Sequence, residues 1–262
     1  MNSVIITTGQ NTSPETILQA KQLAQDWKIP YMNRDDHSLQ YFLAQYEALV
    51  VFTHQGPVLH TSQGSHKFHL NLAQLRIKNI QKGNSDMMLQ AMQLQSGMSV
   101  LDCTLGLATD AVVASFFLGK SGLVTGLESA SLLAKTTEYG LKNFISKDPA
   151  VTCALRKIKV HAENYHDYLR TLPDCAYDIV YFDPMFRHPV KKSSQLNPIR
   201  KLANNSPLTF AALSQAKRVA RQRVVIKEVH NSVEFQRLNI EYTIGGKYSR
   251  IQYGIIEKQV AP

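Results

Sequence analysis

The sequence predicts an α/β fold: a doubly wound, Rossmann-like sheet with a terminal antiparallel hairpin and a small N-terminal α+β appendage. Two patterns carry this prediction. From about residue 99 onward, short apolar runs alternate with helical patterns, which indicates βαβ units around a parallel sheet. Near the C-terminus, apolar runs over 240–244 and 250–257 flank Gly245-Gly246, which is typical of a hairpin. A chain of 262 residues, 44% of them hydrophobic, is long enough to bury such a core.

Residues 1–65 are predicted to form the small α+β subdomain, and residues 66–262 the main domain. An apolar run of strand length covers Val4 to Thr8. A helix should follow from Ser13, because serine is a favoured N-cap and proline comes next in the first turn. The runs 46–52 and 58–61 then indicate two strands of a hairpin.

The segment from Val100 to Asp110 is predicted to be the first βα unit of the main sheet. Its apolar run ends at Asp102, small or uncharged residues follow, and an apolar helix begins at Thr109. Gly106 can adopt the positive φ that a tight turn requires. The alternative for Asp102 is that it only caps the next helix.

The residues absent from this turn indicate which cofactor it binds. A dinucleotide site has the pattern Gly-x-Gly-x-x-Gly, whereas this turn has one glycine and an acid beside it. An acidic strand end repels phosphate and suits a cation. S-adenosylmethionine (SAM) carries an ammonium and a sulfonium and no phosphate. We therefore predict SAM as the cofactor, in contact with Asp102, Thr104 and Gly106.

Two further strand ends extend this prediction. The run 122–127 ends at Glu128, whose carboxylate can accept hydrogen bonds from both ribose hydroxyls, a feature that NAD folds and SAM folds share. The run 157–161 is followed by Glu163 and Asn164, where a SAM site holds the adenine. The alternative for Asn164 is that it only caps the helix after it.

The remaining elements complete the plan of a class I methyltransferase. Ser85 is the predicted N-cap of a helix over 86–94. The other predicted helices cover 131–144, 165–172, 207–220 and 234–238, and the other buried strands cover 177–182 and 223–227.

The fourth strand delivers Asp183-Pro184-Met185-Phe186 at its tip, which looks like the Asp/Asn-Pro-Pro-Tyr/Phe motif of methyltransferases that act on exocyclic amines of bases. Such an amine is a poor nucleophile and needs acceptors aimed at its hydrogens. The Asp183 carboxylate and the Pro184 carbonyl are the predicted acceptors, and Phe186 is predicted to stack on the base. The alternative is a structural turn with Phe186 in the core.

Six segments, taken in this order, resemble the ribosomal RNA small subunit methyltransferase J family. They are His-Lys-Phe at 66–68, Leu-Asp-Cys-Thr-Leu-Gly-Leu-Ala-Thr-Asp-Ala at 101–111, Glu128, His161-Ala162, Asp-Pro-Met-Phe-Arg-His at 183–188 and Arg-Val-Val-Ile-Lys at 223–227. The resemblance covers about residues 65–227 and implies SAM-dependent methylation of guanine N2 in 16S ribosomal RNA. It implies SAM contacts at Thr109, Asp110, Glu128, Ser129, Glu163, Asn164 and Asp183.

The chain departs from the family pattern at several positions. Ala108 stands where the family has a second glycine, and Thr109 stands where it has an arginine. Glu163 replaces a serine, and Arg187 replaces a proline. The cofactor class is expected to survive these changes, whereas the nucleotide target is put in question.

The charge of the chain indicates an anionic partner. The formal net charge is +9, and between Arg187 and Arg223 there are nine Lys or Arg and no Asp or Glu. We predict that this block binds RNA, as 16S ribosomal RNA or a small ribosomal subunit, the alternative being a solvated surface. The predicted RNA contacts are Arg187, Lys191, Lys192, Arg200 and Lys201.

The cysteines and histidines predict no metal site. Three cysteines without a Cys-x-x-Cys spacing indicate reduced thiols and a cytoplasmic location. His54, His60, His66 and His69 lack metalloprotease spacing and are interpreted as polar or RNA-facing residues. The sequence has no run of eighteen apolar residues and no basic N-terminal segment before a long apolar one, so we expect neither a membrane span nor a signal peptide.

The function that the sequence favours is SAM-dependent methylation of an exocyclic amine in RNA, at guanine N2 or adenine N6. A small-molecule or protein methyltransferase is the second possibility, which the basic block disfavours. A non-catalytic RNA-binding protein with the same fold is the third, which the acids Asp183 and Glu128 disfavour.

Overall fold

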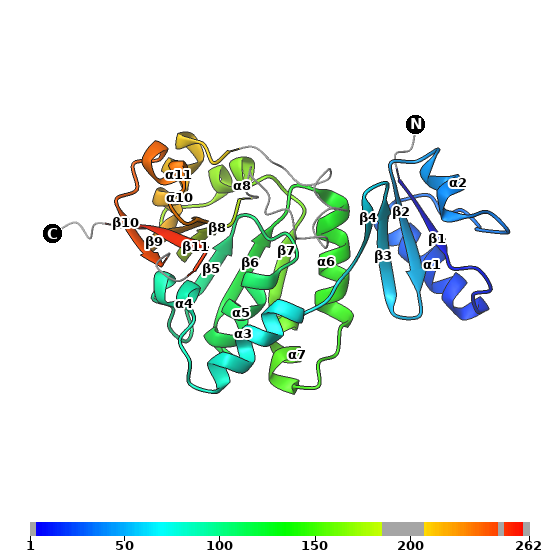
Figure 1. The fold of residues 1–262 in the computed structure, drawn as a ribbon, viewed down its shortest axis with the longest axis horizontal. Helices are drawn as coiled ribbons and strands as arrows, with labels where there is room; N and C mark the ends of the chain where they lie inside the picture. The colour runs from blue at the N-terminus through cyan, green and yellow to red at the C-terminus, as the bar shows by residue number, and fades with distance from the viewer. Residues whose placement is uncertain (1–3, 185–206, 246–248, 259–262) are drawn as a thin grey trace.

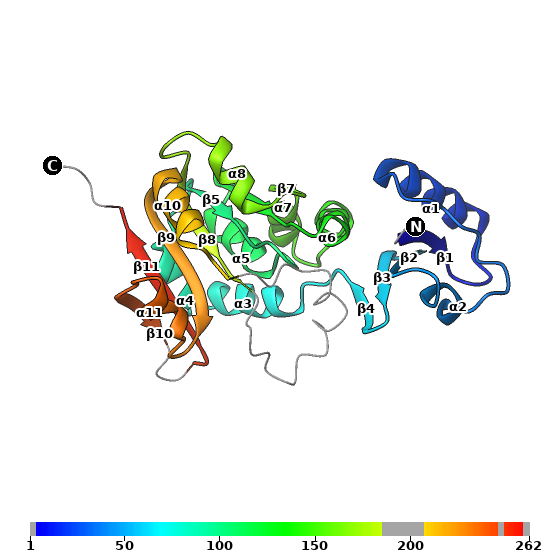
Figure 2. The same ribbon diagram turned by 90° about the horizontal axis from the view of Figure 1, so that it is seen from above.

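The computed structural model describes residues 4–184, 207–245 and 249–258, and in these ranges the chain forms two β-sheets flanked by helices (Figure 1). The smaller sheet has the order β1-β2-β3-β4, and the larger one has the order β10-β11-β9-β8-β5-β6-β7. The two sheets lie side by side, with α6 between them in both ribbon views (Figures 1 and 2). The predicted doubly wound fold and its terminal hairpin are therefore confirmed.

The smaller sheet is built from the N-terminal residues, as predicted. Its strands are β1 (Val4–Thr8), β2 (Ala48–Thr53), β3 (Gly56–Thr61) and β4 (Gly64–Lys67). The helix α1 (Pro14–Trp27) connects β1 to β2, which pair in parallel, and Ser13 caps α1 by accepting a hydrogen bond from Thr16 N. The short helix α2 (Leu39–Leu43) packs Phe42 against the other face of this sheet.

The sequence did not predict β4, because its four residues are short of apolar side chains and only His66 is buried. The subdomain boundary between residues 65 and 66 stays a prediction, and it falls inside β4.

The larger sheet contains five parallel strands and the antiparallel C-terminal pair. In chain order they are β5 (Ser99–Asp102), β6 (Leu123–Leu127), β7 (Ile158–His161), β8 (Tyr177–Phe182), β9 (Ala220–Val229), β10 (Tyr242–Gly245) and β11 (Ile251–Glu257). The chain winds outward from β5 in one direction to β7 and then returns to β8 on the other side. The strand order therefore reverses between β5 and β8, which is where open α/β sheets bind ligands.

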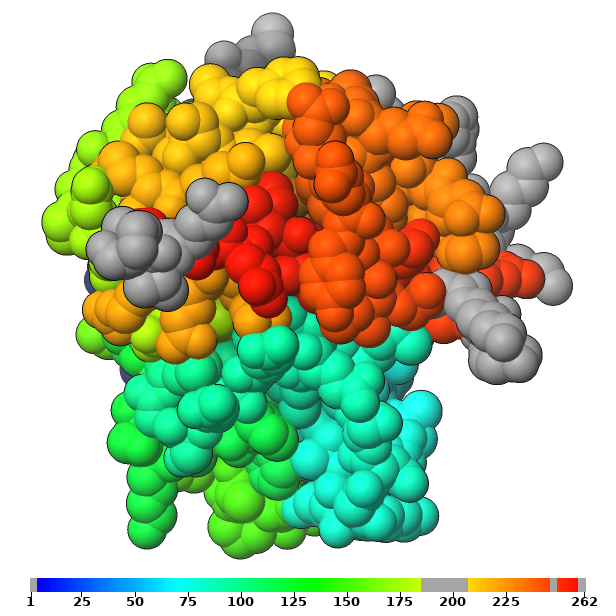
Figure 3. All heavy atoms as spheres, turned by 90° about the vertical axis from the view of Figure 1, so that its left-hand side faces the viewer, coloured from blue at the N-terminus to red at the C-terminus, as the bar shows by residue number. Residues whose placement is uncertain are grey.

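Helices cover both faces of this sheet. One face packs against α3 (Asn71–Gln81), α4 (Met87–Met92), α5 (Thr109–Leu118) and α7 (Pro149–Arg156), and the other against α8 (Tyr165–Thr171), α10 (Phe210–Val219) and α11 (Val233–Arg237). Viewed from the end away from the N-terminus, α4 lies against the C-terminal hairpin (Figure 3). Among the described residues, no helix is long and apolar enough to cross a membrane.

One local prediction needs correction, and one helix was missed. The N-cap of α4 is Asp86 and not Ser85, since Oδ1 of Asp86 accepts from the N–H groups of Met88 and Leu89. Helix α7 was not predicted, although Asp148 caps it and Pro149 occupies its first turn, which is a sequence signal of a helix start.

The smaller sheet is joined to the larger one through α6 (Ser131–Asn143). Leu133 of α6 belongs to the same apolar cluster as Phe52 and Leu59 of the smaller sheet, and the ring of Tyr139 meets the ring of Phe52 edge-on. At Gly140 the helix lets the Phe68 ring approach its backbone, because a Cβ there would overlap that ring. The glycine is therefore needed for this contact.

Gly140→Ala is expected to destabilise the protein. Alanine would otherwise favour a helix interior by about 1 kcal/mol, but the added methyl must displace Phe68, and overpacking costs about 1–3 kcal/mol. Urea unfolding of the variant measures the change, with the exposed substitution Lys142→Ala on the same helix as the control. A Gly140→Ala variant that is more stable than the wild type would contradict the packing argument.

Candidate functional site

The carboxyl ends of the parallel strands bring the predicted acids to one edge of the larger sheet. Asp102 ends β5, Glu128 directly follows β6 and Asp183 directly follows β8. In the strand register Asp102 lies beside Gly126 of β6 and Tyr181 of β8. The Asp183 N–H donates to Thr104 Oγ1 at 2.6 Å, so the turn after β5 is tied directly to the tip of β8.

Asp102 is a buried carboxyl group without a cationic partner among the described side chains. It is 2% exposed, and its Oδ1 accepts from Thr104 N at 3.0 Å. Burial raises the pKa of Asp102 to about 8, and the nearby charges of Asp110 and Asp183 act in the same direction. The interpretation of Asp102 as a helix cap is wrong, because α5 starts after Ala108 and has no side-chain cap.

The turn after β5 has the backbone that its single glycine suggested. Gly106 has φ 50° and Ala108 has φ 59°, so two residues of the turn are in the left-handed region. The N–H of Gly106 donates to Glu128 Oε2 at 3.1 Å, and its carbonyl accepts from Thr137 Oγ1 at 2.9 Å. Ala108 adopts this conformation at the position where the resembled family has glycine, at a cost of about 1–2 kcal/mol.

Glu128 is buried and links two loops. Besides Gly106 N, it accepts from Ala130 N at 2.8 Å, and its pKa is raised because burial outweighs these hydrogen bonds. Ser129 Oγ also lies 3.5 Å from Oε1, so room for a ligand hydroxyl is left mainly at Oε2, which accepts from Gly106 N. Ser129 is exposed beside it.

The residues after β7 are placed at the same edge. Asn164 caps α8, since its Oδ1 accepts from His166 N at 2.9 Å at the start of this helix. Glu163 is exposed and is the second residue after β7. Neither observation excludes a ligand contact, because the Asn164 amide nitrogen can still donate.

A buried network of charges lies beneath this edge, and sequence reasoning missed it. Asp110, in the first turn of α5, forms ion pairs with Arg76 of α3 and with Lys227 of β9, and Tyr181 of β8 donates to it at 2.7 Å. Lys227 Nζ lies 2.9 Å from Asp110 Oδ2 and 2.7 Å from Asp183 Oδ2. The motif aspartate is therefore held by a lysine from the neighbouring strand.

Asp86 extends the network on the other side. Arg76 donates from Nε and Nη2 to the two oxygens of Asp86, at 2.8 and 2.9 Å, which is the bidentate geometry of strong ion pairs. The same Asp86 caps α4. Two cations thus face three acids, and this excess of negative charge lies close to the uncompensated Asp102.

The pKa values follow from this arrangement. Burial alone would raise the pKa of Asp110, but Lys227 and Arg76 hold it well below its usual range. The pKa of Asp183 is raised, because burial and the Asp110 charge outweigh the attraction of Lys227. Burial lowers the pKa of Lys227, yet Asp110 and Asp183 more than reverse this effect, so the ammonium stays charged.

One signal in the sequence pointed to this network. Lys227 was predicted at the end of a buried strand, and the parallel order of the sheet places this strand end beside the acids. Arg76 gave no such signal, because it comes from a helix outside the strand pattern.

Three arginines of the basic block are paired with acids. Arg218, Arg221 and Arg223 form ion pairs with Asp174, Asp178 and Glu257, at 2.8, 2.6 and 3.1 Å. These arginines are at or before the amino end of β9, opposite the edge that holds Lys227 and Asp183. The charges of these three arginines are therefore paired within the fold, while Lys217 is exposed. Phe186, Arg187, Lys191, Lys192, Arg200 and Lys201 lie outside the described residues.

The histidines divide into two kinds. His66 is buried, and burial lowers its pKa to about 4, so it is neutral at physiological pH. The interpretation of His66 as RNA-facing is therefore wrong. His54 is exposed, and His60 and His69 are half-buried.

Comparisons with known proteins agree with this geometry. Residues 22–254 match a family model described as "Putative SAM-dependent methyltransferase". A Bacillus subtilis relative, "Uncharacterized protein YpiP", is 35% identical over 97% of this chain and 99% of its own. The "Ribosomal RNA small subunit methyltransferase J" of Pseudomonas paraeruginosa is 31% identical over 68% of this chain and 67% of its own. The J proteins of Pseudomonas aeruginosa strains are similar to the same degree.

A solved structure confirms the fold over almost the whole chain. The SAM-dependent methyltransferase NGO1261 from Neisseria gonorrhoeae superposes with a TM-score of 0.67, covering 98% of this chain and 97% of that one. At 16% sequence identity this likeness concerns the fold alone.

Lys227→Met is expected to destabilise the folded protein strongly at neutral pH. The change leaves Asp110 and Asp183 close together without their shared ammonium, and removing one partner of a buried ion pair costs about 3–5 kcal/mol. Urea unfolding at pH 7 measures the loss, with the exposed Lys159→Met in β7 as the control.

The effect should also depend on pH. In the wild type the lowered pKa of Asp110 gives stability that is present above the ordinary carboxyl pKa and lost as the pH falls towards the folded value. In the variant the carboxyls regain stability when they are protonated. The difference between the two proteins should therefore shrink between pH 7 and pH 4, and a constant difference would argue against the charge network.

Proposed function

The chain belongs to the family of SAM-dependent methyltransferases, and from this premise we propose that its substrate is ribosomal RNA, methylated on an exocyclic amine of a base. The match of residues 22–254 to the family model establishes the premise. The similarity to the J proteins of Pseudomonas is the observation that carries the proposal of ribosomal RNA. Guanine N2 of 16S ribosomal RNA is the proposed position, and a ribosomal substrate implies a cytoplasmic enzyme.

The proposed reaction is a single displacement. The amine nitrogen bonds to the methyl carbon, the carbon–sulfur bond breaks with its electron pair going to sulfur, and the amine later loses a proton. Alignment of nitrogen, methyl and sulfur supplies much of the catalysis through proximity. Positive charge develops on the nitrogen, so an acceptor aimed at its hydrogen stabilises the transition state.

We assign the acceptor role to Asp183, together with the Pro184 carbonyl. Lys227 binds Oδ2 of Asp183, and Thr104 Oγ1 accepts from its N–H, so both the carboxylate and the backbone of this residue are held. The side chain is 30% exposed, which leaves it accessible from the strand edge. Phe186 remains the proposed stacking partner for the base.

The proposed cofactor contacts follow the strand edge. Asp102 is assigned to the positively charged end of SAM, and Glu128 to the ribose, with Ser129 beside it. Because Asn164 Oδ1 already caps α8, its amide nitrogen is left to donate to a ring nitrogen of adenine, and Glu163 is left to accept from the adenine amine. Thr104, Gly106 and Thr109 line the turn that the cofactor approaches.

Asp110 takes a different part in this proposal. Its carboxylate already has Arg76, Tyr181 and Lys227 as partners. We propose that it acts mainly by fixing Lys227, and through Lys227 the position of Asp183.

The proposed function predicts label transfer from SAM to RNA. The protein is incubated with tritiated SAM and, in parallel, with total RNA, small ribosomal subunits and a metabolite extract from cells that lack the gene, where the target is unmodified. Label should enter the RNA or the subunits, and nuclease digestion should release N2-methylguanosine. Release of N6-methyladenosine would correct the atom, and label confined to the metabolites would overturn the RNA proposal.

Asp183→Ala should lower the rate of single-turnover methyl transfer about 10²- to 10³-fold, by analogy with the loss of one oriented hydrogen-bond partner. Asp183→Asn keeps an acceptor oxygen and should lose less. The exposed Asp167→Asn on α8 serves as the matched control, and thermal melts test folding. A folded Asp183→Ala protein with a normal rate would remove Asp183 from the mechanism.

We expect the affinity for SAM to rise with pH because of the carboxyl group of Asp102. With a pKa of about 8 in the free protein, its carboxyl must lose a proton before it pairs with a cation. The Kd for SAM should fall by up to about tenfold per unit between pH 6 and pH 8, as linkage requires. Calorimetry at several pH values measures this dependence.

Asp102→Asn is the control for that experiment. It should bind SAM weakly with a flat profile, and comparison with the wild type cancels the titration of SAM itself. Since a raised carboxyl pKa makes the folded state less stable as the pH rises from about 4 to about 8, the variant should also melt above the wild type at pH 8. Parallel pH profiles of SAM affinity in the two proteins would show that Asp102 does not pair with the cofactor.

A further inference from the structure

A groove separates the smaller sheet from α6, and the methyl-transfer site does not account for it. Its volume is about 540 Å³, and its walls include His54, Lys67, Phe68, Tyr139 and Asn143. One wall is the β2–β3 turn with the segment after β4, and the other is the middle and end of α6. In both ribbon views the smaller sheet and α6 face each other here (Figures 1 and 2).

The charge of the groove suits a phosphate. Its lining residues include Lys67 and two histidines, His54 and His69, and no acid. Lys67 Nζ donates to the amide oxygen of Gln55, and among the described residues it forms no ion pair, so its positive charge is not neutralised. A groove of one sign of charge concentrates oppositely charged ligands.

The groove also offers aromatic surface. Phe68, Tyr139 and Phe144 line it, and the rings of Phe68 and Phe144 lie 6.0 Å apart, inclined by 65°. Aromatic side chains beside a basic residue are the combination that single-stranded nucleic acid binds, through stacked bases and paired phosphates. Two glycines fix these rings, since a Cβ at Gly56 would lie 2.8 Å from Tyr139 and one at Gly140 would overlap Phe68.

Helix α6 runs from the strand edge to the groove. It begins at Ser131, directly after the loop that contains Glu128, and Tyr139 in the groove wall lies about 12 Å further along the helix axis. The groove therefore offers a second contact surface to a polynucleotide that extends along α6 from the strand edge.

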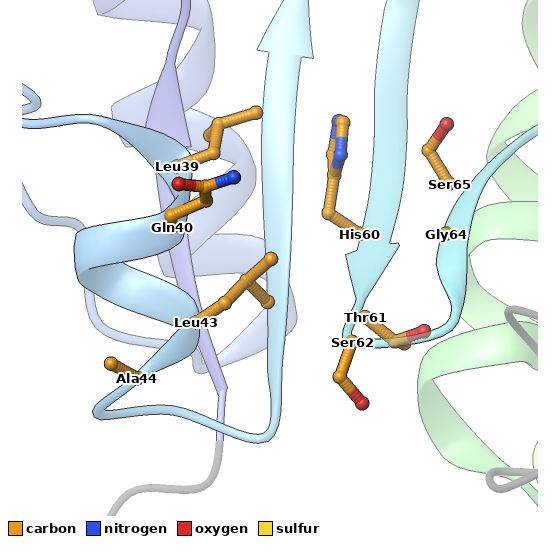
Figure 4. A pocket seen from close by; sticks show the side chains of 9 residues that line it. All are labelled: Leu39, Gln40, Leu43, Ala44, His60, Thr61, Ser62, Gly64 and Ser65. Atoms are coloured by element: carbon orange, nitrogen blue, oxygen red, sulfur yellow. The ribbon is translucent and has the colours of Figure 1, made fainter.

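A second hollow of similar size in the described part of the chain lacks these features. It lies between α2 and the β3–β4 hairpin, where Figure 4 shows Leu39 and Leu43 opposite His60. Its walls contain one histidine and otherwise uncharged residues, with no aromatic ring besides that imidazole. Phosphate and base recognition thus favour the groove beside α6.

We propose that this groove binds a single-stranded nucleotide of the RNA substrate next to the methylated position, with its phosphate at Lys67 and its base against Tyr139. The inference rests on the proposed RNA substrate and adds the surface that holds it. The smaller sheet then serves as one wall of the RNA-binding surface.

The test measures binding of a fluorescein-labelled single-stranded RNA dodecamer by anisotropy at several salt concentrations. Lys67→Glu should weaken binding and reduce the slope of log K against log salt by about 0.7, because one phosphate contact is lost. Tyr139→Ala should weaken binding by about 5- to 150-fold, the equivalent of one lost stack of about 1–3 kcal/mol. SAM affinity should be unchanged in both variants.

Lys120→Glu is the matched control, since it makes the same change of charge at an exposed position between α5 and β6. Tyr139→Leu keeps the packing against Gly56 if the alanine variant melts early. If Lys67→Glu binds RNA with the affinity and salt slope of Lys120→Glu, the groove proposal is overturned, as it is if the wild type binds no RNA.

Methyl transfer by the wild type to ribosomal RNA is measured separately, and this measurement tests the proposed function. If the wild type methylates RNA and the groove variants bind RNA normally, the proposed function stands and the groove proposal is overturned. If the wild type binds the dodecamer through Lys67 but transfers no label to RNA, the proposed function is overturned.

Discussion

The buried carboxylate of Asp110 is the constraint on which the geometry of the site depends. A carboxylate that is 7% exposed can stay ionised only with partners, and it draws them from three different elements: Arg76 of α3, Tyr181 of β8 and Lys227 of β9. The lysine that satisfies Asp110 also holds Asp183. The partners that buried Asp110 needs at the start of α5 thus also fix Asp183, the residue assigned to the substrate amine. Because buried ion pairs often contribute little net stability, we interpret the network as a device that sets position.

The strand edge could be predicted from the sequence, and the network beneath it could not. Asp102, Glu128 and Asp183 each follow an apolar run, and parallel strands bring such residues together whatever the helices do. Arg76 is 34 residues from Asp110 and belongs to a helix whose packing no local pattern specifies. The basic block contains three arginines whose ion pairs were missed for a related reason. Its composition was read correctly, but the acids that neutralise Arg218, Arg221 and Arg223 come from Asp174, Asp178 and Glu257, which lie outside the block.

The distribution of charge in the fold separates two tasks. The formal net charge is +9, yet the strand edge is acidic, with Asp102 left without a cation of its own. This suits a cofactor that brings positive charge, and it disfavours direct approach of phosphates to the same place. An RNA substrate therefore needs its backbone held away from the cofactor. The groove at Lys67 meets that need, because it is basic and lies along α6 from the acidic edge.

If phosphates are held away from the acidic strand edge, the smaller sheet has a role as one wall of the groove that holds them. The resemblance that runs from about residue 65 to residue 227 contains the acids of the strand edge, but the groove also requires Gly56 and His54, which precede that range. Under the two proposals, methyl transfer and the recognition of flanking nucleotides thus depend on different parts of the chain. Gly56 and Gly140 set how closely the two parts approach, since a side chain at either position would push on Tyr139 or Phe68. If the groove binds RNA as proposed, changes within the smaller sheet alter which RNA is held while Asp183, Lys227 and Asp110 keep the same arrangement.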